Sequence, residues 1–210
     1  MTDDITTIDL FPLRLVLLPG EALPLHIFEE RYRRLIARCR ESGSAFGAIM
    51  HEDDSVAEAG CTAVVHEVVE ELEDGRLNII VRGRQRFRIE TLLQPDDPET
   101  DCLRGRIRVF DDDPDGDDVD HLVAEAEPLF SRLVALMGAG VMEVPRGDDP
   151  LSFRLASAVD FGVALKQRLL EAVSETDRLD LLVTVMQGLI PSLELRRDRE
   201  EAIRGNGKGN

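Results

Sequence analysis

A run of acidic residues near the middle of this 210-residue chain separates two kinds of hydrophobic pattern. The run occupies residues 111–118, DDDPDGDD, and its charge, proline and glycine predict a solvated linker. Before it, apolar and polar residues alternate with a period of two, as in half-buried strands. After it, apolar residues recur every three or four positions, as in amphipathic helices. The chain is therefore predicted to be an α+β protein with a β-rich subdomain at 1–112, a linker at 113–118 and a helical subdomain at 119–195.

The first half contains a clear hairpin signal. Residues 62–72 and 77–81 read as strands, and Asp74-Gly75 lies between them, where glycine tolerates the positive φ of a tight turn. Arginines alternate with apolar residues in the segments 84–89 and 103–110, as expected for strands with one buried face. Hairpins with few crossover helices favour a closed or nearly closed antiparallel barrel, which leaves few exposed edges.

One helix is predicted within the β-rich half, at residues 28–42. Its apolar residues recur at helical spacing, with charged residues on the remaining surface. We expect this apolar stripe to face the barrel, so that its members, together with Phe87, belong to the core. The stripe consists of Phe28, Tyr32, Leu35, Ile36 and Cys39.

The second half is predicted to be helical at 119–137, 149–159, 165–173 and 175–190. Pro128 is expected to kink the first of these helices, and Pro191 to follow the last. The tail at 196–210, which ends in a glycine-rich stretch, is expected to be disordered.

Composition restricts the function. The chain has 42 acidic and 25 basic residues, a net charge of −17, which opposes general nucleic-acid binding because phosphate contacts require cations. No stretch approaches the roughly 20 apolar residues of a membrane helix, and the N-terminus carries acids where a secretory signal carries Lys or Arg. We expect a cytoplasmic protein without a membrane partner.

No catalytic, metal or cofactor site is predicted. The four histidines lie too far apart in sequence for helical ligand spacing, and Cys39, Cys61 and Cys102 form no paired motif and are expected to pack as small apolar residues. Residues 51–54, HEDD, could gather a hard cation through their oxygens, but a solvated turn is favoured. The sequence GNGKGN near the C-terminus lacks the spacing of a phosphate loop.

A strand of arginines is the sharpest local charge feature. It could contact an anion or an acidic peptide, but a solvated face paired with acids across the sheet is the favoured interpretation. The four residues concerned are Arg82, Arg84, Arg86 and Arg88.

Several motifs together resemble the N-terminal, substrate-binding domain of Lon protease. The opening residues FPL at 11–13, VLLPGE at 16–21 and LPLHIFEERY at 23–32 resemble the first motif of that family. Further similar segments follow in the same order, and the resemblance extends over roughly residues 7–190. They are GCTA at 60–63, DGRL at 74–77, VRGRQRFRI at 81–89, KQRLLE at 166–171 and DRLDLL at 177–182.

The resemblance implies a PUA-like pseudobarrel followed by a helical bundle, in a standalone Lon-domain protein without ATPase or protease domains. The lysines, Lys166 and Lys208, do not follow a plausible nucleophilic serine. The implied function is a non-catalytic module that binds protein or unfolded peptide segments, with a role in protein quality control or regulated proteolysis. The alternative is nucleic-acid or modified-base binding, since PUA-like barrels elsewhere bind RNA, although the net charge opposes it. An enzyme with an unrecognised site is a third hypothesis.

The protein-binding surface is predicted within residues 17–25, LLPGEALPL. Two prolines and a glycine force turns there, so not all of its apolar residues can face the core. A buried connection is favoured for Leu17 and Leu25, which leaves the predicted site to four others that could equally mediate self-association. These are Leu18, Pro19, Leu23 and Pro24.

Overall fold

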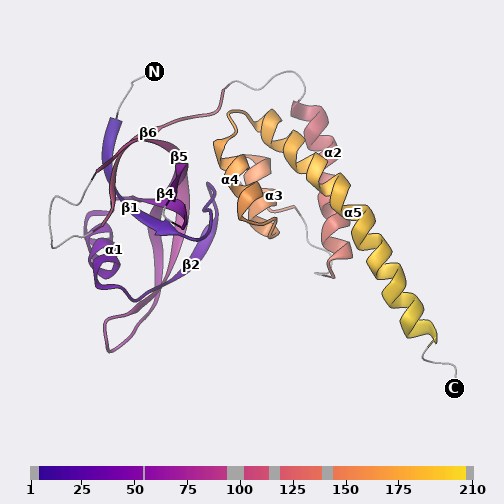
Figure 1. Ribbon diagram of the computed structural model, residues 1–210, viewed down its shortest axis with the longest axis horizontal. Helices are drawn as coiled ribbons and strands as arrows, with labels where there is room; N and C mark the ends of the chain where they lie inside the picture. Colours follow the sequence, from indigo (N-terminus) through magenta and orange to yellow (C-terminus); the bar gives the residue numbers. More distant parts are fainter. Residues whose placement is uncertain (1–4, 54, 94–101, 114–118, 139–143, 207–210) are drawn as a thin grey trace. The chain divides into compact units, whose positions relative to one another are not determined.

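The computed structural model describes residues 5–53, 55–93, 102–113, 119–138 and 144–206, and the chain divides into two compact units (Figure 1). The first unit, the barrel unit, comprises residues 1–111 and 161–171, and the second, the helical unit, comprises 112–160 and 172–210. Residues 161–171 thus lie with the strands, whereas the sequence analysis grouped them with the other helices. Of the predicted linker at 113–118, only residue 113 lies within the described residues.

The barrel unit contains a six-stranded sheet and two helices. The strands are β1 (Ile5–Leu13), β2 (Ala22–Ile27), β3 (Phe46–Glu52), β4 (Ser55–Glu71), β5 (Leu77–Leu93) and β6 (Arg104–Val109), and the helices are α1 (Glu30–Ser42) and α4 (Val163–Glu171).

The strand pairing closes into a ring. The order is β2-β5-β4-β3-β1-β6, and β6 pairs again with β5, so β5, β4, β3, β1 and β6 enclose a core, while β2 is attached to the outside of the ring through β5. The predicted closure is present, but the expected all-antiparallel pairing is wrong at one place, because β1 and β3 run parallel. A parallel pair needs a crossover connection, which β2 and α1 supply here.

The predicted hairpin at Asp74-Gly75 is confirmed. β4 and β5 have 17 residues each and are joined by a turn in which Gly75 has a φ of 80°. The Leu72 backbone N–H donates to the Arg76 carbonyl at 2.9 Å and closes the turn. Both strands are long enough for β5 to pair with β2 and β4 at one end and with β4 and β6 at the other.

Aliphatic and aromatic side chains fill the ring. Leu10, Ile49, Phe87 and Ile107 form one buried cluster, in which the Phe87 side chain is fully buried, as predicted. Helix α1 covers the barrel with the predicted stripe of Tyr32, Leu35, Ile36 and Cys39 buried, and Gly43 ends it with a left-handed φ of 68°. The three cysteines are buried, and none of them forms a disulfide.

The predicted burial of Phe28 is wrong. Its side chain is 61% exposed, and α1 begins after it, at Glu30. Ile27, the last residue of β2, is only 1% exposed, and side chains of successive residues in an extended chain point to opposite sides. Phe28 therefore points outward, on the same side as His26, whose ring centroid lies 6.1 Å away.

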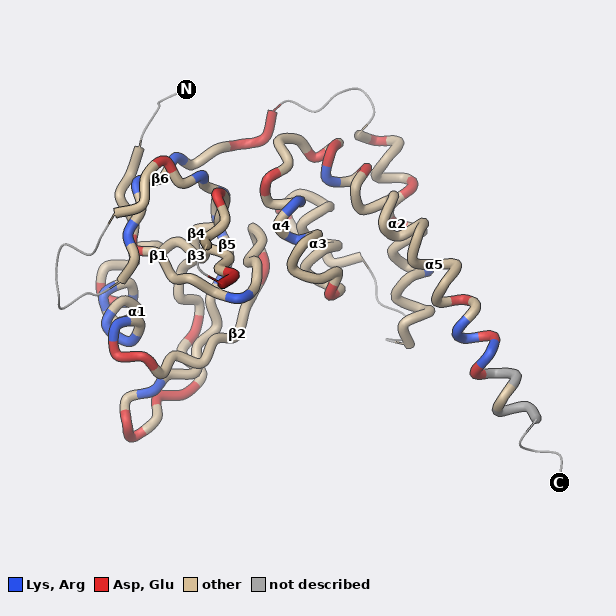
Figure 2. Tube along the Cα trace, viewed as in Figure 1, with Lys and Arg blue, Asp and Glu red and all other residues tan. Residues whose placement is uncertain are grey.

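The helical unit contains α2 (Val119–Leu136), α3 (Leu151–Ala158) and α5 (Glu175–Asn206). Pro128 lies inside α2 and Pro191 inside α5, so the prediction that the last helix ends near residue 190 is wrong, as is the expected disorder of residues 196–206. Residues 207–210 lie outside the described residues. Beyond Pro191, Glu194 of α5 pairs with Arg132 of α2 at 2.5 Å, and the described turns that follow mix basic and acidic helix formers (Figure 2). None of the described helices is both long enough and apolar enough to cross a membrane.

Asp112, the second acid of the central run, is not simply solvated. It pairs with Arg178 of α5, whose side chain is fully buried and also bonds to Glu175 and Ser152. Burial alone would lower the pKa of the Arg178 guanidinium, but the hydrogen bonds that it donates to the Asp112 carboxylate and the charges of Asp112 and Glu175 raise that pKa above its ordinary value. The start of the acidic run at 111–118 is thus fixed within the helical unit.

Candidate protein-binding site

Two of the four predicted site residues are buried. The Leu18 side chain is fully buried and Pro19 is buried beside it. The backbone here lies against β5, since a Cβ on Gly83 would come within 2.1 Å of the Leu18 carbonyl oxygen. Gly20 N–H donates to the Gly83 carbonyl at 3.1 Å, and Gly83 N–H donates to the Glu21 carbonyl at 3.0 Å. The prediction that Leu18 and Pro19 lie on the surface is therefore wrong, because the turn folds inward.

The other two predicted residues lie in β2, with Leu23 half-buried and Pro24 exposed. Their partners in β5 are Val81 and Ile80. Within the described sheet β2 has no second neighbour, so its outer edge carries unpaired backbone groups. A proline fits an edge strand, where its missing N–H costs no ladder hydrogen bond.

The outward side of β2 continues into Phe28. Ala22, Pro24 and His26 are exposed at alternate positions, and Phe28 follows at the same spacing. His26 Nδ1 lies 2.7 Å from Asn78 Oδ1 on β5, which orients the imidazole beside the Phe28 ring. We name Ala22, Leu23, Pro24, His26 and Phe28 the β2 surface. The alternation ending at Ile27 was the signal that could have placed Phe28 here rather than in the core.

The turn that precedes β2 in the chain is fixed by α4. Lys166 Nζ on α4 donates to Glu21 Oε1 at 2.6 Å, with only 15% and 11% of the two side chains exposed. Glu21 Oε2 also accepts the Leu18 backbone N–H at 2.9 Å. The ion pair therefore connects α4 to the turn that leads into the β2 surface.

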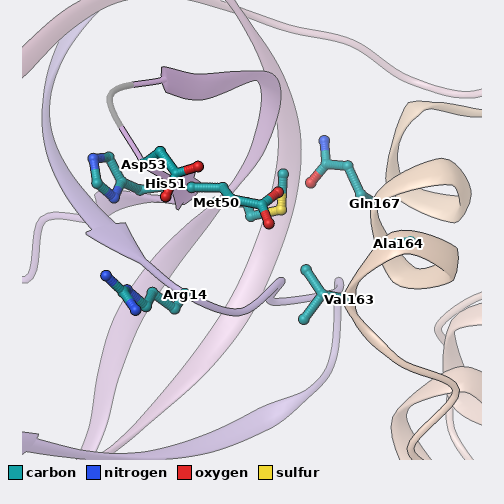
Figure 3. A pocket seen from close by; sticks show the side chains of 8 residues that line it. Arg14, Met50, His51, Asp53, Val163, Ala164 and Gln167 are labelled. Atoms are coloured by element: carbon teal, nitrogen blue, oxygen red, sulfur yellow. The ribbon is translucent and has the colours of Figure 1, made fainter.

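A cavity of about 490 Å³ lies between α4 and the end of β3 within the barrel unit (Figure 3). We call it the α4 pocket. Sequence reasoning missed it as a site, because α4 was assigned to the other half of the chain. Its lining residues are Arg14, Met50, His51, Glu52, Asp53, Val163, Ala164 and Gln167.

Gln167 is the most buried polar residue of this pocket, with 8% of its surface exposed. Its Nε2 donates to the Ala59 carbonyl at 3.2 Å and to Glu171 Oε1 at 2.6 Å. Figure 3 shows the side chain extending from α4 toward Met50. Its amide oxygen is buried and accepts no hydrogen bond from any residue that the structure describes.

A second cavity, of about 730 Å³, adjoins the first. Arg14 and His51 line both cavities, and the second continues past Leu13, Tyr32 and Leu103. The two cavities therefore share part of their lining within the barrel unit.

The turn between β3 and β4 contributes the acids of the α4 pocket. Asp53 has a φ of 52°, a left-handed value that aspartate adopts more readily than most residues. Within the described residues no group of three or more His, Cys, Asp or Glu side chains is arranged to hold a metal ion. The fourth residue of the HEDD stretch, Asp54, lies outside the described residues.

The arginine strand does not present one uniform face. Arg82, Arg84 and Arg88 are exposed, but Arg86 is only 4% exposed. Arg86 Nη1 donates to the Leu170 carbonyl of α4 at 3.1 Å, and its guanidinium lies 4.3 Å from the centre of the Phe110 ring. A bulge between Gly83 and Arg86, opposite Cys61 and Ala63, changes the side to which Arg86 points. The interpretation of Arg86 as a solvated residue is wrong.

Comparisons with known proteins agree on one family. The family model of the ATP-dependent protease La (LON) substrate-binding domain matches residues 7–188. A Lon protease from Porphyromonas gingivalis is 28% identical over 200 residues, which cover 87% of this chain and 23% of that protein. A Lon protease from Parabacteroides distasonis is 33% identical over 153 residues, covering 67% of this chain and 17% of that protein. The chain thus spans about a quarter or less of the length of these relatives.

Solved structures show the same architecture. The crystal structure of a Lon N-terminal domain protein from Xanthomonas campestris has a TM-score of 0.64 at 27% identity and covers 86% of this chain and 98% of that one. The N-terminal domain of a Mycobacterium avium complex Lon protease has a TM-score of 0.70 at 21% identity, with 87% and 98% covered, and supports the fold alone. Because the family model covers most of both units, the chain belongs to the Lon substrate-binding domain family.

Proposed function

We propose that this chain is a non-catalytic module that binds segments of client proteins, in protein quality control or regulated proteolysis in the cytoplasm. Its family supplies the general role of substrate recognition. The observation that carries the proposal is the open outer edge of β2 beside an exposed apolar side chain, Phe28. On this proposal the barrel is of the PUA-like type and the second unit is its helical bundle.

The mode of binding follows from the edge. An extended client segment can add to β2 as a further strand, with backbone hydrogen bonds giving affinity and alternate side chains giving contact with Leu23, Pro24 and Phe28. Unfolded segments are suited to this mode, because their backbone groups are not yet paired. The same edge could join two copies of the chain, so self-association is the competing use of the surface.

The test compares client binding with oligomer mass. The full chain is passed over a column carrying an unfolded, carboxymethylated protein and over an RNA column, at low and moderate salt. We expect retention on the unfolded protein that persists at moderate salt, and weak retention on RNA. Retention on RNA alone would contradict the proposal.

The double variant Pro24→Ser and Phe28→Ser should lose client retention while unfolding at about the same denaturant concentration, because both side chains are exposed. Val69→Ser serves as the matched control, because Val69 is an apolar strand residue of the same unit and is 58% exposed. If the double variant loses only a dimeric mass in sedimentation and keeps client binding, the β2 surface is a self-association surface.

A further inference from the structure

The α4 pocket contains negative charge that the chain does not pair internally. Glu52 and Asp53 are exposed at its rim, and neither carboxylate forms an ion pair or a side-chain hydrogen bond with any residue that the structure describes. Arg14 lines the same cavity and is likewise unpaired within the described residues. The rim therefore carries two negative charges and one positive charge.

The interior of the pocket contains an acceptor that has no donor. Gln167 Nε2 contacts two acceptors, the Ala59 carbonyl and Glu171 Oε1, so the nitrogen must lie on that side of the planar amide. The Gln167 oxygen is therefore the atom left for the pocket. Buried acceptors without donors cost free energy, which a bound group carrying an N–H could recover.

The walls are apolar and one of them can adapt. Val163 is 39% exposed, and Ala164 and Met50 supply further apolar lining beside His51. The Gln167 oxygen is covered by neighbouring atoms, so a donor can reach it only when a side chain beside it moves. Met50 suits this role, since methionine is unbranched and repacks readily.

Arg14 does not make the pocket an anion site. A carboxylate bound there would face Glu52 and Asp53, and it would leave the Gln167 oxygen without a donor. Arg14 also lines the second cavity, so its side chain can lie there rather than in the α4 pocket. An alkyl stem that ends in a positively charged donor, by contrast, matches the walls, the acceptor and the rim together.

We propose that the α4 pocket binds a lysine or arginine side chain of the client segment. The aliphatic stem lies against Met50 and Val163, the charged head group donates to the Gln167 oxygen, and the carboxylates of Glu52 and Asp53 attract its positive charge from the rim. This inference rests on the proposed function, because it names the kind of residue that the bound segment supplies. The net charge of −17 additionally favours the approach of basic segments.

The test uses one peptide scaffold with a single variable position. A flexible, terminally blocked peptide of alanine, serine and leucine carries lysine, norleucine or glutamate at its centre, and binding to the full chain is measured by fluorescence anisotropy. We expect the lysine peptide to bind about tenfold more tightly than the norleucine peptide, which has a similar stem without the charge. Higher salt should reduce this difference.

Two double variants locate the effect. Glu52→Gln with Asp53→Asn should abolish the preference for lysine over norleucine. Glu71→Gln with Glu73→Gln is the matched control, because it removes the same charge from exposed residues of the β4-β5 hairpin and should keep the preference. With methyl-labelled methionine, the NMR signal of Met50 should shift with the lysine peptide more than with the norleucine peptide.

The outcomes separate this inference from the proposed function. Equal binding of all three peptides overturns the inference and leaves the proposed function in place. Tightest binding of the glutamate peptide overturns the inference in favour of an anion site at Arg14. If both double variants lose the preference for lysine over norleucine equally, the inference is overturned in favour of general charge attraction. If no peptide binds and no unfolded client is retained, the inference and the proposed function both fail.

Discussion

A few buried polar side chains hold the elements of the helical unit together. Arg178 is fully buried, and it is surrounded by the carboxylates of Asp112 and Glu175 and by the Ser152 hydroxyl, with Phe153 stacked 4.4 Å from the guanidinium. Glu175 also accepts the Ser152 backbone N–H at 2.8 Å, so its carboxylate connects the start of α3 to α5. These groups act as one network rather than as separate pairs.

Arg178→Met should destabilise the protein strongly. Removing the guanidinium leaves the Glu175 carboxylate, which is 11% exposed, without its cation, and breaking such a buried pair costs about 3 to 5 kcal/mol. Urea unfolding followed by helical circular dichroism measures the loss. Arg132→Met, which removes an arginine that is 58% exposed, should cost less than about 1 kcal/mol and is the control.

Phe28 and Phe87 should respond oppositely to truncation. Phe87 is fully buried in the core cluster, so Phe87→Ala should cost about 3 to 5 kcal/mol of unfolding free energy. Phe28 is 61% exposed, so Phe28→Ala should change it by only about 0.5 kcal/mol. A large loss for Phe28 in equilibrium unfolding would mean that this side chain is covered in solution.

At the scale of elements, what could be predicted from sequence is local. The β4-β5 hairpin follows from Asp74-Gly75, and α1 follows from the spacing of Tyr32, Leu35 and Cys39, because both signals lie within a few residues of one another. The parallel pairing of β1 with β3 and the position of α4 depend on contacts between distant parts of the chain, which periodicity does not encode.

The candidate site likewise combines features that local sequence predicts with features that depend on distant contacts. The partial exposure of the β2 residues could be predicted from the sequence. The inward turn at Leu18 could not, because it depends on the close approach of Gly83, and the outward direction of the Phe28 side chain depends on where α1 begins. The α4 pocket combines residues separated by more than a hundred positions, such as Met50 and Gln167. No local pattern could have joined them.

The contact between α4 and the loop at Glu21 can be measured directly. In a double-mutant cycle with Lys166→Met and Glu21→Gln, we expect each single variant to be destabilised and the pair to show a coupling energy of about 1 to 2 kcal/mol. Both side chains are mostly buried, so solvent screens the pair less than a surface pair. Additive effects of the two substitutions would show that the ion pair does not hold α4.

At the scale of the whole molecule, the proposed role predicts binding without chemistry. Purified chain should show neither ATP hydrolysis nor peptide cleavage, because phosphoryl transfer requires a phosphate cradle and a metal site, and Lon-like cleavage requires a Ser-Lys pair. Coupled ATPase and fluorogenic peptide assays, run across the fractions of a final size-exclusion step, measure both activities. Activity that follows the protein peak through repeated purification would contradict this prediction.

The chain crosses between its two units three times, since residues 161–171 return to the barrel unit between two segments of the helical unit. A protease that cuts once, between residues 111 and 112, would therefore not free the barrel, because α4 on the other fragment still fills its place beside β4. Along the chain, α5 connects directly to α4, so tension applied at the C-terminal end would reach the barrel unit through α4 if α5 unravelled. Loss of α4 would take away Gln167, Val163 and the Lys166 contact together. A pull strong enough to remove α4 would thus dismantle the α4 pocket.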